Sequence, residues 1–347
     1  MGIAAAETVI AWQSHEGLRI SKANGLDVIE CAMCGFRHVV PLPDSRALEA
    51  TYREAYYRDE KPTFLTHAGE DQDWAELAQN DRLEAFEHLL PSDRRRLLDI
   101  GSGPGFFLKT AKARGWKALG IEPSRQAAKH ARSLGLEVAE GFFNSDTAPG
   151  LGRFDAIQLN NVLEHVPDPA AILIEARELL EPNGVLCVNV PNDYSPLQIA
   201  ARAATTKTEW WVSPKHHLNY FDFESLAGLL ERLGFTIADR STSFPMELFL
   251  LMGEDYTADP ALGRACHSRR KRFDQALEAA GLGQTRRAFY RALASVGLGR
   301  EAAILAVKSS APRHPPSSSF PVDAPARPCC TRRCRRSPTS KCITNMR

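Results

Sequence analysis

The sequence contains no long hydrophobic run. No stretch of its 347 residues approaches the ~18 consecutive apolar residues that a membrane-spanning helix needs. The opening residues, MGIAAAETVIAWQSHEG, lack both the basic start and the apolar segment of a secretion signal. Of the cysteines before residue 309, only Cys31 and Cys34 lie close together in the sequence, so no disulfide framework is expected. We therefore expect a cytoplasmic protein without a membrane span.

The charge is nearly balanced along most of the chain. The net charge is +1, but residues 309–347 carry eight Lys or Arg against one Asp, a net of +7. Subtracting this from +1 leaves −6 for residues 1–308, which argues against a nucleic-acid footprint on the body. The tail is rich in Pro, Ser and Cys and is expected to be disordered. Its basic residues leave binding to nucleic acid or an acidic membrane open, and its cysteines leave metal binding open.

Strands alternate with helices from residue 97 onward. Before that point the helical period predicts helices over 45–58 and 72–90. The alternation predicts βαβ units and an α/β, doubly wound, mostly parallel sheet. The predicted strands lie at 97–100, 116–122, 136–141, 154–161, 185–192, 235–244 and 300–308, and the helices at 106–115, 124–135, 169–184, 194–208, 224–234 and within 246–298.

A glycine-rich turn follows the first of these strands. In LLDIGSGPGFFL an apolar strand contains Asp99 near its end, and a helix begins directly after the turn. The N-terminus of a helix offers unpaired N–H groups to an anionic ligand. The turn contains Gly101, Ser102, Gly103 and Gly105.

An acidic residue stands at the end of the second strand. Glu122 follows Gly101 by 21 residues, and an acid at such a strand end can accept hydrogen bonds from both hydroxyls of a ribose. The dinucleotide fingerprint G-x-G-x-x-G is not met, because Phe106 stands where its third glycine is required. This departure disfavours a nicotinamide dehydrogenase.

Together with FDAIQLNNVLEHVPDP (154–169) and LLEPNGVLCVNVPN (179–192), this turn resembles the class I S-adenosylmethionine-dependent methyltransferases. The resemblance covers about residues 95–243, with 300–308 as the family's last, antiparallel strand. It implies a Rossmann-like methyltransferase sheet, mostly parallel. The expected organisation is a small N-terminal segment at 1–44, a helical lead-in at 45–94, the methyltransferase domain at 95–308 with a helical insertion at 246–298, and a tail at 309–347.

The resemblance also implies the cofactor, S-adenosylmethionine, and the residues that bind it. Asp99 would hold the cofactor's amino group, and Glu122 would hold the ribose hydroxyls. The glycines would shape the loop around the methionine part, the two phenylalanines would flank the adenine, and a backbone carbonyl at the end of the fourth strand would face the sulfonium. The implied set is Asp99, Gly101, Ser102, Gly103, Gly105, Glu122, Phe142, Phe143 and Asn160.

Three histidines follow the fourth and fifth strands. His165 lies in LEHV, and His216 and His217 lie in PKHHLNYF. Ligands of doubly wound sheets bind at the carboxyl ends of the strands, and a histidine there can accept a proton near neutral pH. We name these three residues as candidate catalytic bases. The alternative is that they orient loops through hydrogen bonds to the backbone.

No metal site is expected from the sequence. Cys31-x-x-Cys34, followed by His38, resembles half of a small zinc ribbon that precedes the methyltransferase domain in some sugar- and natural-product-modifying relatives. Only His15 is found upstream, and two ligands cannot close a tetrahedral site. If elemental analysis nevertheless found one zinc per chain, His15 and His38 would be the missing ligands.

The segment after the fourth predicted strand is likewise expected not to bind a metal. Ubiquinone-type O-methyltransferases, to which this segment is similar, carry Glu-x-x-Glu-His as a metal site. Here Asn161 replaces the first acid and leaves only Glu164 and His165.

These features predict a methyltransferase acting at oxygen on a small-molecule or carbohydrate-type acceptor, covered in part by the helical insertion. The alternative is a catalytically silent module that binds S-adenosylmethionine or S-adenosylhomocysteine. The oligomeric state is left open. Four aromatic residues would line an acceptor pocket or else form ordinary packing: Trp210, Trp211, Tyr220 and Phe221.

Overall fold

The computed structural model describes residues 8–43, 48–49, 52–53, 69–205 and 207–309. The tail predicted to be disordered lies outside the described residues apart from Ser309, as does most of the helix predicted at 45–58. No helix in the described part of the chain is long and apolar enough to cross a membrane.

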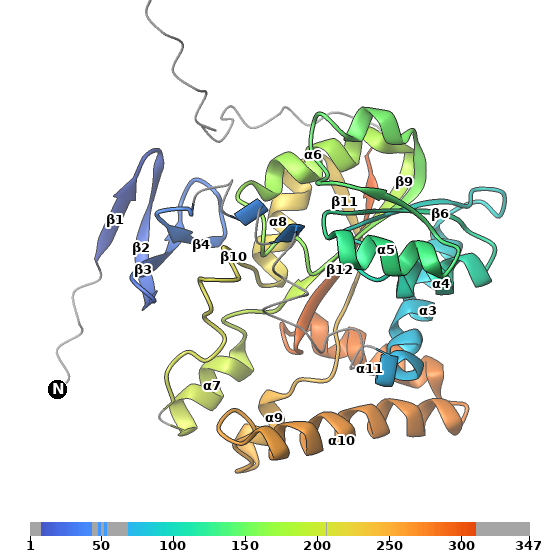
Figure 1. Ribbon diagram of the computed structural model, residues 1–347. Coiled ribbons are helices and arrows are strands. Elements are labelled where there is room, and N and C mark those ends of the chain that lie inside the picture. Colours follow the sequence, from blue (N-terminus) through green and yellow to red (C-terminus); the bar gives the residue numbers. More distant parts are fainter. Residues whose placement is uncertain (1–7, 44–47, 50–51, 54–68, 206, 310–347) are drawn as a thin grey trace, which may run out of the picture. The chain divides into compact units, whose positions relative to one another are not determined.

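Seven strands form the larger sheet (Figure 1). They are β5 (Arg96–Ile100), β6 (Lys117–Glu122), β7 (Glu137–Glu140), β8 (Phe154–Asn160), β9 (Leu180–Pro191), β11 (Phe235–Ser241) and β12 (Glu301–Lys308). Their order is β11-β12-β9-β8-β5-β6-β7. In this order, each strand from β9 to β7 is parallel to the next. Strand β12 is antiparallel to both of its neighbours, β9 and β11. This confirms the predicted fold class and brings the carboxyl ends of β5, β6, β8 and β9 to one edge.

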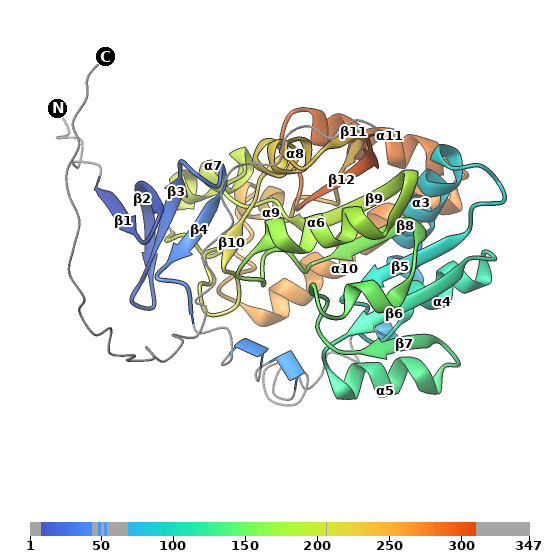
Figure 2. The ribbon, with the colours of Figure 1, turned by 90° about the horizontal axis from the view of Figure 1, so that it is seen from above.

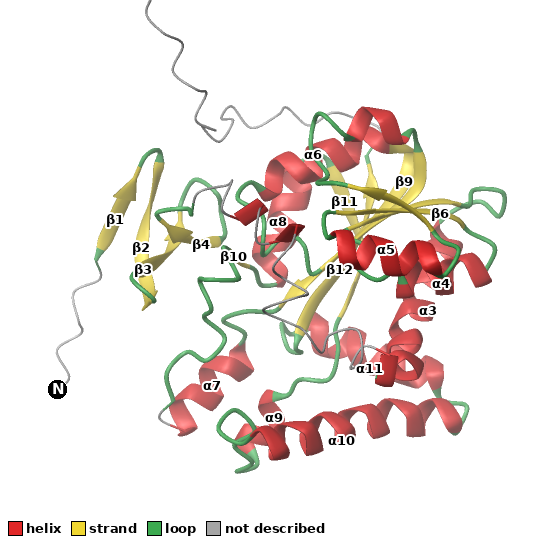
Figure 3. Ribbon diagram, in the orientation of Figure 1, coloured by secondary structure: helices red, strands yellow, loops and turns green. Residues whose placement is uncertain are grey.

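Helices cover both faces of this sheet (Figures 2 and 3). On one face, apolar side chains of α3 (Gln72–Leu89), α4 (Phe106–Ala113) and α5 (Arg125–Ser133) form one buried cluster with residues of the strands. Because successive strand residues point to opposite faces, the alternate strand residues face α6 (Pro169–Leu179) and α8 (Phe223–Arg232), which pack on β9, β11 and β12. A short 3-10 helix, Ala148–Leu151, precedes β8.

The fifth predicted strand begins earlier than the sequence suggested. The helix expected over 169–184 ends at Leu179, and Pro182 and Gly184 belong to β9 instead. The reason is tertiary: Leu180 already pairs with Phe154 in the sheet. The sheet pairing therefore ends the helix before Pro182 and Gly184.

The insertion between β11 and β12 is helical, as predicted. It contains α9 (Glu247–Leu251), α10 (Pro260–Ala279) and α11 (Gly283–Ser295), and α7 (Pro196–Thr205) contacts α9. Several polar contacts join it to α3, among them the following. Trp74 Nε1 donates to Asp274 Oδ2 at 2.8 Å, and Arg286 pairs with Asp81 at 2.8 Å. The insertion therefore packs against the helix that leads into the domain.

A second, antiparallel sheet lies at the N-terminal end of the chain (Figure 1). Its strands, in spatial order, are β1 (Val9–Trp12), β2 (His15–Ala23), β3 (Leu26–Cys31), β4 (Arg37–Val40) and β10 (Asn219–Tyr220). Strand β10 comes from the segment between α7 and α8, so the larger domain contributes the last strand of the N-terminal sheet.

The expectation that Cys31 and Cys34 lack partner ligands is wrong. His15 begins β2 and His38 lies in β4, and both approach the two cysteines. Antiparallel pairing causes this, because β3 lies between β2 and β4 and places Cys31 opposite Gly17. The four donor atoms lie within 4.8 Å of one another.

Candidate functional site

The glycine turn after β5 has no room for larger side chains. Gly101 has a φ of +71°, and a Cβ there would lie 2.6 Å from Cγ2 of Val162. Gly105 has a φ of +87°, and a Cβ there would lie 2.8 Å from the Cβ of Ala131 on α5. Only glycine adopts this backbone conformation without cost. The turn is therefore held close both to α5 and to the loop that follows β8.

Glu122 is fastened to this turn by its carboxylate. The N–H of Gly103 donates to Oε2 at 2.8 Å, and the N–H of Ser124 donates to Oε1 at 2.9 Å. Burial raises the pKa of Glu122, and the two backbone donors oppose that shift. A carboxylate can accept about four hydrogen bonds, so Glu122 retains acceptor positions for the two hydroxyls of a ribose.

Asp99 is a second buried carboxyl at the same sheet edge. Its side chain is 2% exposed, and Gln158 Nε2 on β8 donates to its Oδ1 at 3.1 Å. Burial raises the pKa of Asp99 to about 7, while the Gln158 hydrogen bond and the charge of Arg82 act in the opposite direction. Asp99 is thus poised to gain from a cationic partner, because a positive charge would stabilise its ionised form.

Arg82, which the sequence analysis did not single out, supplies the cationic side chain of this region. From α3 it donates to Gln158 Oε1 at 3.2 Å and to Asn160 Oδ1 at 2.9 Å. Asn189 Nδ2 also donates to Asn160 Oδ1, at 3.0 Å. Nothing in the helical period of α3 marks Arg82, because its partners lie more than 70 residues away in the sequence.

The remaining predicted cofactor residues lie near the same edge. Phe142 follows Gly141, whose N–H donates to the Glu122 carbonyl at 3.0 Å. Phe143 is buried, whereas Phe142 is partly exposed beneath the guanidinium of Arg53, 5.6 Å from the ring centre. Asn160 ends β8, and its side chain is held by Arg82. No ligand contact tests these roles, so they stay predictions.

The structure brings the predicted histidines together from two loops. The rings of His165 and His217 meet edge to face, with centroids 5.0 Å apart. His216 contributes its backbone carbonyl, which lies 2.7 Å from His165 Nδ1. A carbonyl can only accept, so Nδ1 carries the hydrogen and Nε2 keeps its lone pair in the neutral ring. The hydrogen bond therefore fixes the orientation of the His165 ring, and its role as a base stays a prediction.

An acidic residue accompanies the two histidines. Glu164 Oε1 lies 3.7 Å from His165 Nε2, and Glu164 is almost fully buried. The donor atoms of Glu164, His165 and His217 all lie within 4.8 Å of one another. The sequence motif contains only Glu164 and His165 of the expected ligands, because Asn161 stands at the position of the first acid. His217 supplies a third donor that only the fold brings near.

Backbone hydrogen bonds join the two histidine loops. The N–H groups of Leu218 and Asn219 donate to the Glu164 carbonyl at 2.6 and 3.1 Å. The side-chain amide of Asn219 donates to the carbonyls of Leu163 and Val166 at 2.8 and 2.7 Å. Strand β10, which begins at Asn219, thereby fixes the spacing between His165 and His217.

Two of the aromatic residues considered for an acceptor pocket are packing residues. Tyr220 is fully buried in a small core with Val28 and Val39 of the N-terminal sheet. The ring of Phe221 packs on Phe36, with centroids 4.9 Å apart. Both side chains hold the N-terminal sheet to the larger domain.

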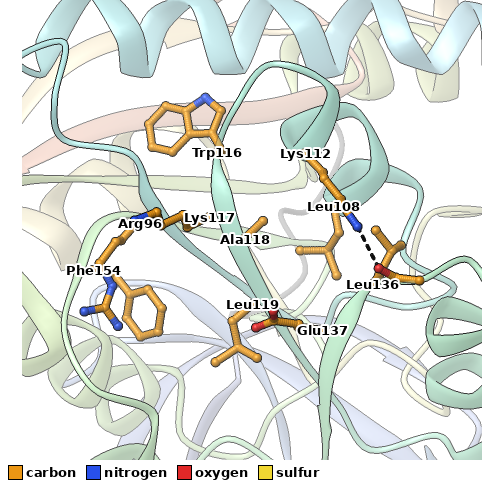
Figure 4. Close-up of a pocket in the computed structure, with 11 residues that line it drawn as sticks. Arg96, Leu108, Lys112, Trp116, Lys117, Ala118, Leu119, Leu136, Glu137 and Phe154 are labelled. Carbon is orange, nitrogen blue, oxygen red and sulfur yellow. Dashed lines mark hydrogen bonds between the residues drawn. The ribbon is translucent and has the colours of Figure 1, made fainter.

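A cavity of about 440 Å³ lies at the opposite ends of the strands (Figure 4). Arg96, Lys117, Glu137 and Phe154, which line it, stand at or next to the starts of β5 to β8. The candidate residues stand at the carboxyl ends of these strands. The cavity is therefore separate from the site built around Asp99 and the histidines.

Four features define a Rossmann-like domain that binds a cofactor at one edge of its sheet. They are the strand order of the large sheet, its antiparallel β12, the glycine turn and the acidic residue at the end of β6. Residues 68–239 match a family model described as a methyltransferase domain.

Similar proteins include the ubiquinone biosynthesis O-methyltransferase of Xylella fastidiosa, 32% identical over 175 residues that cover 46% of this chain and 68% of the relative. The enzyme of that name from Actinobacillus pleuropneumoniae serotype 5b is 31% identical over 153 residues, which cover 38% of this chain and 65% of that relative. The chain thus spans just under two thirds of the latter protein. A solved SAM-dependent methyltransferase structure from Archaeoglobus fulgidus is similar with a TM-score of 0.45 and 17% identity, covering 68% of this chain and 94% of that one.

The chain belongs to the class I S-adenosylmethionine-dependent methyltransferases. The residues present fit the family's cofactor, S-adenosylmethionine. Glu122 retains acceptor positions for the ribose hydroxyls. Asp99 is a buried carboxyl whose ionised form a cationic ligand group would stabilise. The turn at Gly101 has no side chain that would block a ligand.

Proposed function

We propose that this chain is an active enzyme that transfers a methyl group from S-adenosylmethionine to an oxygen of a small-molecule acceptor, with carbohydrate-type metabolites among the candidates. One observation carries the proposal. His165 is held through Nδ1 by the His216 carbonyl, and it lies in the loop whose Val162 abuts the cofactor turn at Gly101. The O-methyltransferase names of the relatives support an oxygen acceptor.

Each end of the cofactor has a chemically matched group on the chain. When bound, S-adenosylmethionine supplies an electrophilic methyl group on a sulfonium. Glu122 would accept from its ribose hydroxyls, and Asp99 would pair with its ammonium group. Arg82, which contacts Gln158 as Asp99 does, would bind its carboxylate. Phe142 and Phe143 would flank the adenine.

Methyl transfer is an in-line displacement, so the chain mainly positions the two reactants and excludes water. An acceptor hydroxyl must also lose its proton. His165 Nε2 would take that proton, and the new imidazolium would be stabilised by the Nδ1–H bond to the His216 carbonyl and by Glu164, 3.7 Å away. His217 packs against the same ring and limits its rotation.

A second candidate mechanism rests on the three donor atoms of Glu164, His165 and His217. A divalent cation held by these residues would lower the pKa of the acceptor hydroxyl directly, and His165 would then be a ligand instead of a base. The two mechanisms use the same side chains. Their responses to chelation differ.

The test begins with wild-type protein, an isotopically labelled methyl donor and a metabolite extract, with mass spectrometry to identify the labelled product. His165→Ala should keep its affinity for S-adenosylhomocysteine and lose about 10²–10⁴-fold in turnover. The matched control is His88→Ala, because His88 Nδ1 also bonds a backbone carbonyl, at 2.8 Å, but on the exposed side of α3. Control turnover should be unchanged.

Of three other results, the first would contradict the proposed function and the other two would contradict His165 as the base. Cofactor binding without any labelled product would indicate the catalytically silent module. Full turnover of His165→Ala would exclude His165 as the base. Loss of wild-type activity on chelation, restored by a divalent cation, would favour the metal mechanism.

A further inference from the structure

Four side chains of the N-terminal sheet converge on one point. His15 begins β2, Cys31 ends β3, Cys34 lies in the following turn and His38 lies in β4. All four are buried, with exposed fractions of 2%, 1%, 6% and 2%. Each offers a donor atom, and the four atoms lie within 4.8 Å of one another. Two sulfurs and two nitrogens therefore enclose a common centre.

The measured separations fit a tetrahedral metal. Cys31 Sγ and Cys34 Sγ lie 3.6 and 3.3 Å from Nδ1 of His15. Zinc binds sulfur at about 2.3 Å and imidazole nitrogen at about 2.0 Å, which places the two ligand atoms about 3.5 Å apart at a tetrahedral angle. The two sulfur–nitrogen separations match this spacing, and all the donor atoms lie within 4.8 Å of one another.

The surrounding hydrogen bonds orient the donors inward. His38 Nδ1 lies 2.9 Å from the carbonyl of Val39, so Nδ1 carries the hydrogen and Nε2 offers a lone pair. Within the described residues, His38 Nε2 is buried and has no hydrogen-bond partner. The N–H of Cys34 points to Cys31 Sγ at 3.5 Å, which would stabilise a thiolate. A buried imidazole nitrogen without a partner is costly unless a ligand binds it.

Charge balance selects the ion. Two thiolates and two neutral imidazoles neutralise one divalent cation, so the buried centre would carry no net charge. Thiolate and imidazole ligands in a tetrahedral arrangement favour zinc among the common divalent metals. Four protein ligands leave no open position for a substrate, so the role is structural.

We propose that His15, Cys31, Cys34 and His38 bind one structural Zn²⁺. The metal ties β2, β3 and β4 together at a single point. His38 pairs with Asn219 of β10, and the Asn219 side chain holds the loop at Leu163 and Val166. Zinc therefore also stabilises the segment that carries His165 and His217, although the binding site itself does not depend on the proposed function.

The decisive experiment uses full-length wild-type protein purified without chelator. Elemental analysis should find about one zinc per chain. X-ray absorption at the zinc edge should show two sulfur neighbours at about 2.3 Å and two nitrogen neighbours at about 2.0 Å. Protein without zinc would overturn the proposal. A shell of only nitrogen and oxygen would place the metal at Glu164, His165 and His217, and three or four sulfurs would place it on cysteines outside the described residues.

Variants give an independent check. Cys34→Ser and His38→Gln should each reduce the zinc content at least about tenfold, whereas Cys266→Ser, at a buried cysteine on α10, should leave it unchanged. Replacing the four tail cysteines by serine in the full chain should also leave one zinc bound. Retention of zinc by both Cys34→Ser and His38→Gln would overturn the assignment. The absorption spectrum of the wild type decides the question even where a variant fails to fold. The four tail cysteines are Cys329, Cys330, Cys334 and Cys342.

Discussion

Lowering the pH from 7.5 to 6 should weaken cofactor binding through one residue, Asp99. Its carboxyl is 2% exposed, and burial raises its pKa to about 7 in the free protein. Under the proposed function, the ionised form pairs with the ammonium group of the cofactor. A protonated Asp99 offers that group no charge. Affinity should therefore rise as the pH rises through 7.

The magnitude follows from the titration. With a pKa of about 7, roughly a tenth of Asp99 is ionised at pH 6 and about three quarters at pH 7.5. Binding that requires the ionised form is then about eightfold weaker at pH 6. With a pKa of about 7.7–8.0, the cofactor's own α-amino group is nearly fully protonated at pH 6 but only about 60–75% protonated at pH 7.5, which reduces the expected ratio to about five- to sixfold.

The same shift has a consequence for stability without cofactor. Between the ordinary pKa of 3.8 and about 7, the folded protein binds more protons at Asp99 than the unfolded chain does. The free energy of unfolding therefore falls as the pH rises through that window. About three pKa units at ~1.36 kcal/mol each give an upper limit of about 4 kcal/mol.

Calorimetric titration with S-adenosylhomocysteine measures the binding effect. Repeating it in two buffers of different ionisation enthalpy counts the protons released, which should approach one per cofactor at pH 6. Asp99→Asn keeps the shape of the side chain and should remove both the pH dependence and the proton release. Glu122→Gln is the matched control, and its pH dependence should persist. Affinity that stays flat in the wild type, or a pH dependence that survives in Asp99→Asn, would refute the reasoning.

Three further predictions concern the same sheet edge. Glu122→Ala should weaken S-adenosylhomocysteine binding by about 1.5–3 kcal/mol, measured by calorimetry, and equal affinity would show that the ribose assignment is wrong. Arg82→Met should weaken S-adenosylhomocysteine at least about tenfold but leave 5′-methylthioadenosine, which lacks the carboxylate, unaffected; equal losses for both ligands would contradict the assignment. Gly105→Ala should lower the free energy of unfolding, measured by urea denaturation, by at least about 2 kcal/mol, because the left-handed φ and the close contact of the new Cβ, 2.8 Å from Ala131, both add to the cost. The control is Gly115→Ala, which has a left-handed φ but open space around it, and it should cost only about 1–2 kcal/mol.

The sequence alone determined the central sheet and the cofactor edge of this protein. Strands β5 and β8 are short, mainly apolar runs, and local signals such as the Ser124 cap of α5 bound the strands and helices of this region. The glycines of the turn were readable because the backbone itself requires them at Gly101 and Gly105. The position of Glu122 followed from the length of one βα unit. These features are local, so the order of the residues suffices to predict them.

Only the tertiary structure decided which distant side chains meet. His15 reaches Cys31 through the pairing of β2 with β3, and no periodicity in the sequence marks that register. His217 reaches His165 because β10 joins the N-terminal sheet while Asn219 holds the loop after β8. Antiparallel pairing and loop-to-loop hydrogen bonds set these contacts across separations of many residues. The grouping of donor side chains around Cys31 therefore could not be predicted from the sequence, because it is a property of packing and not of spacing along the chain.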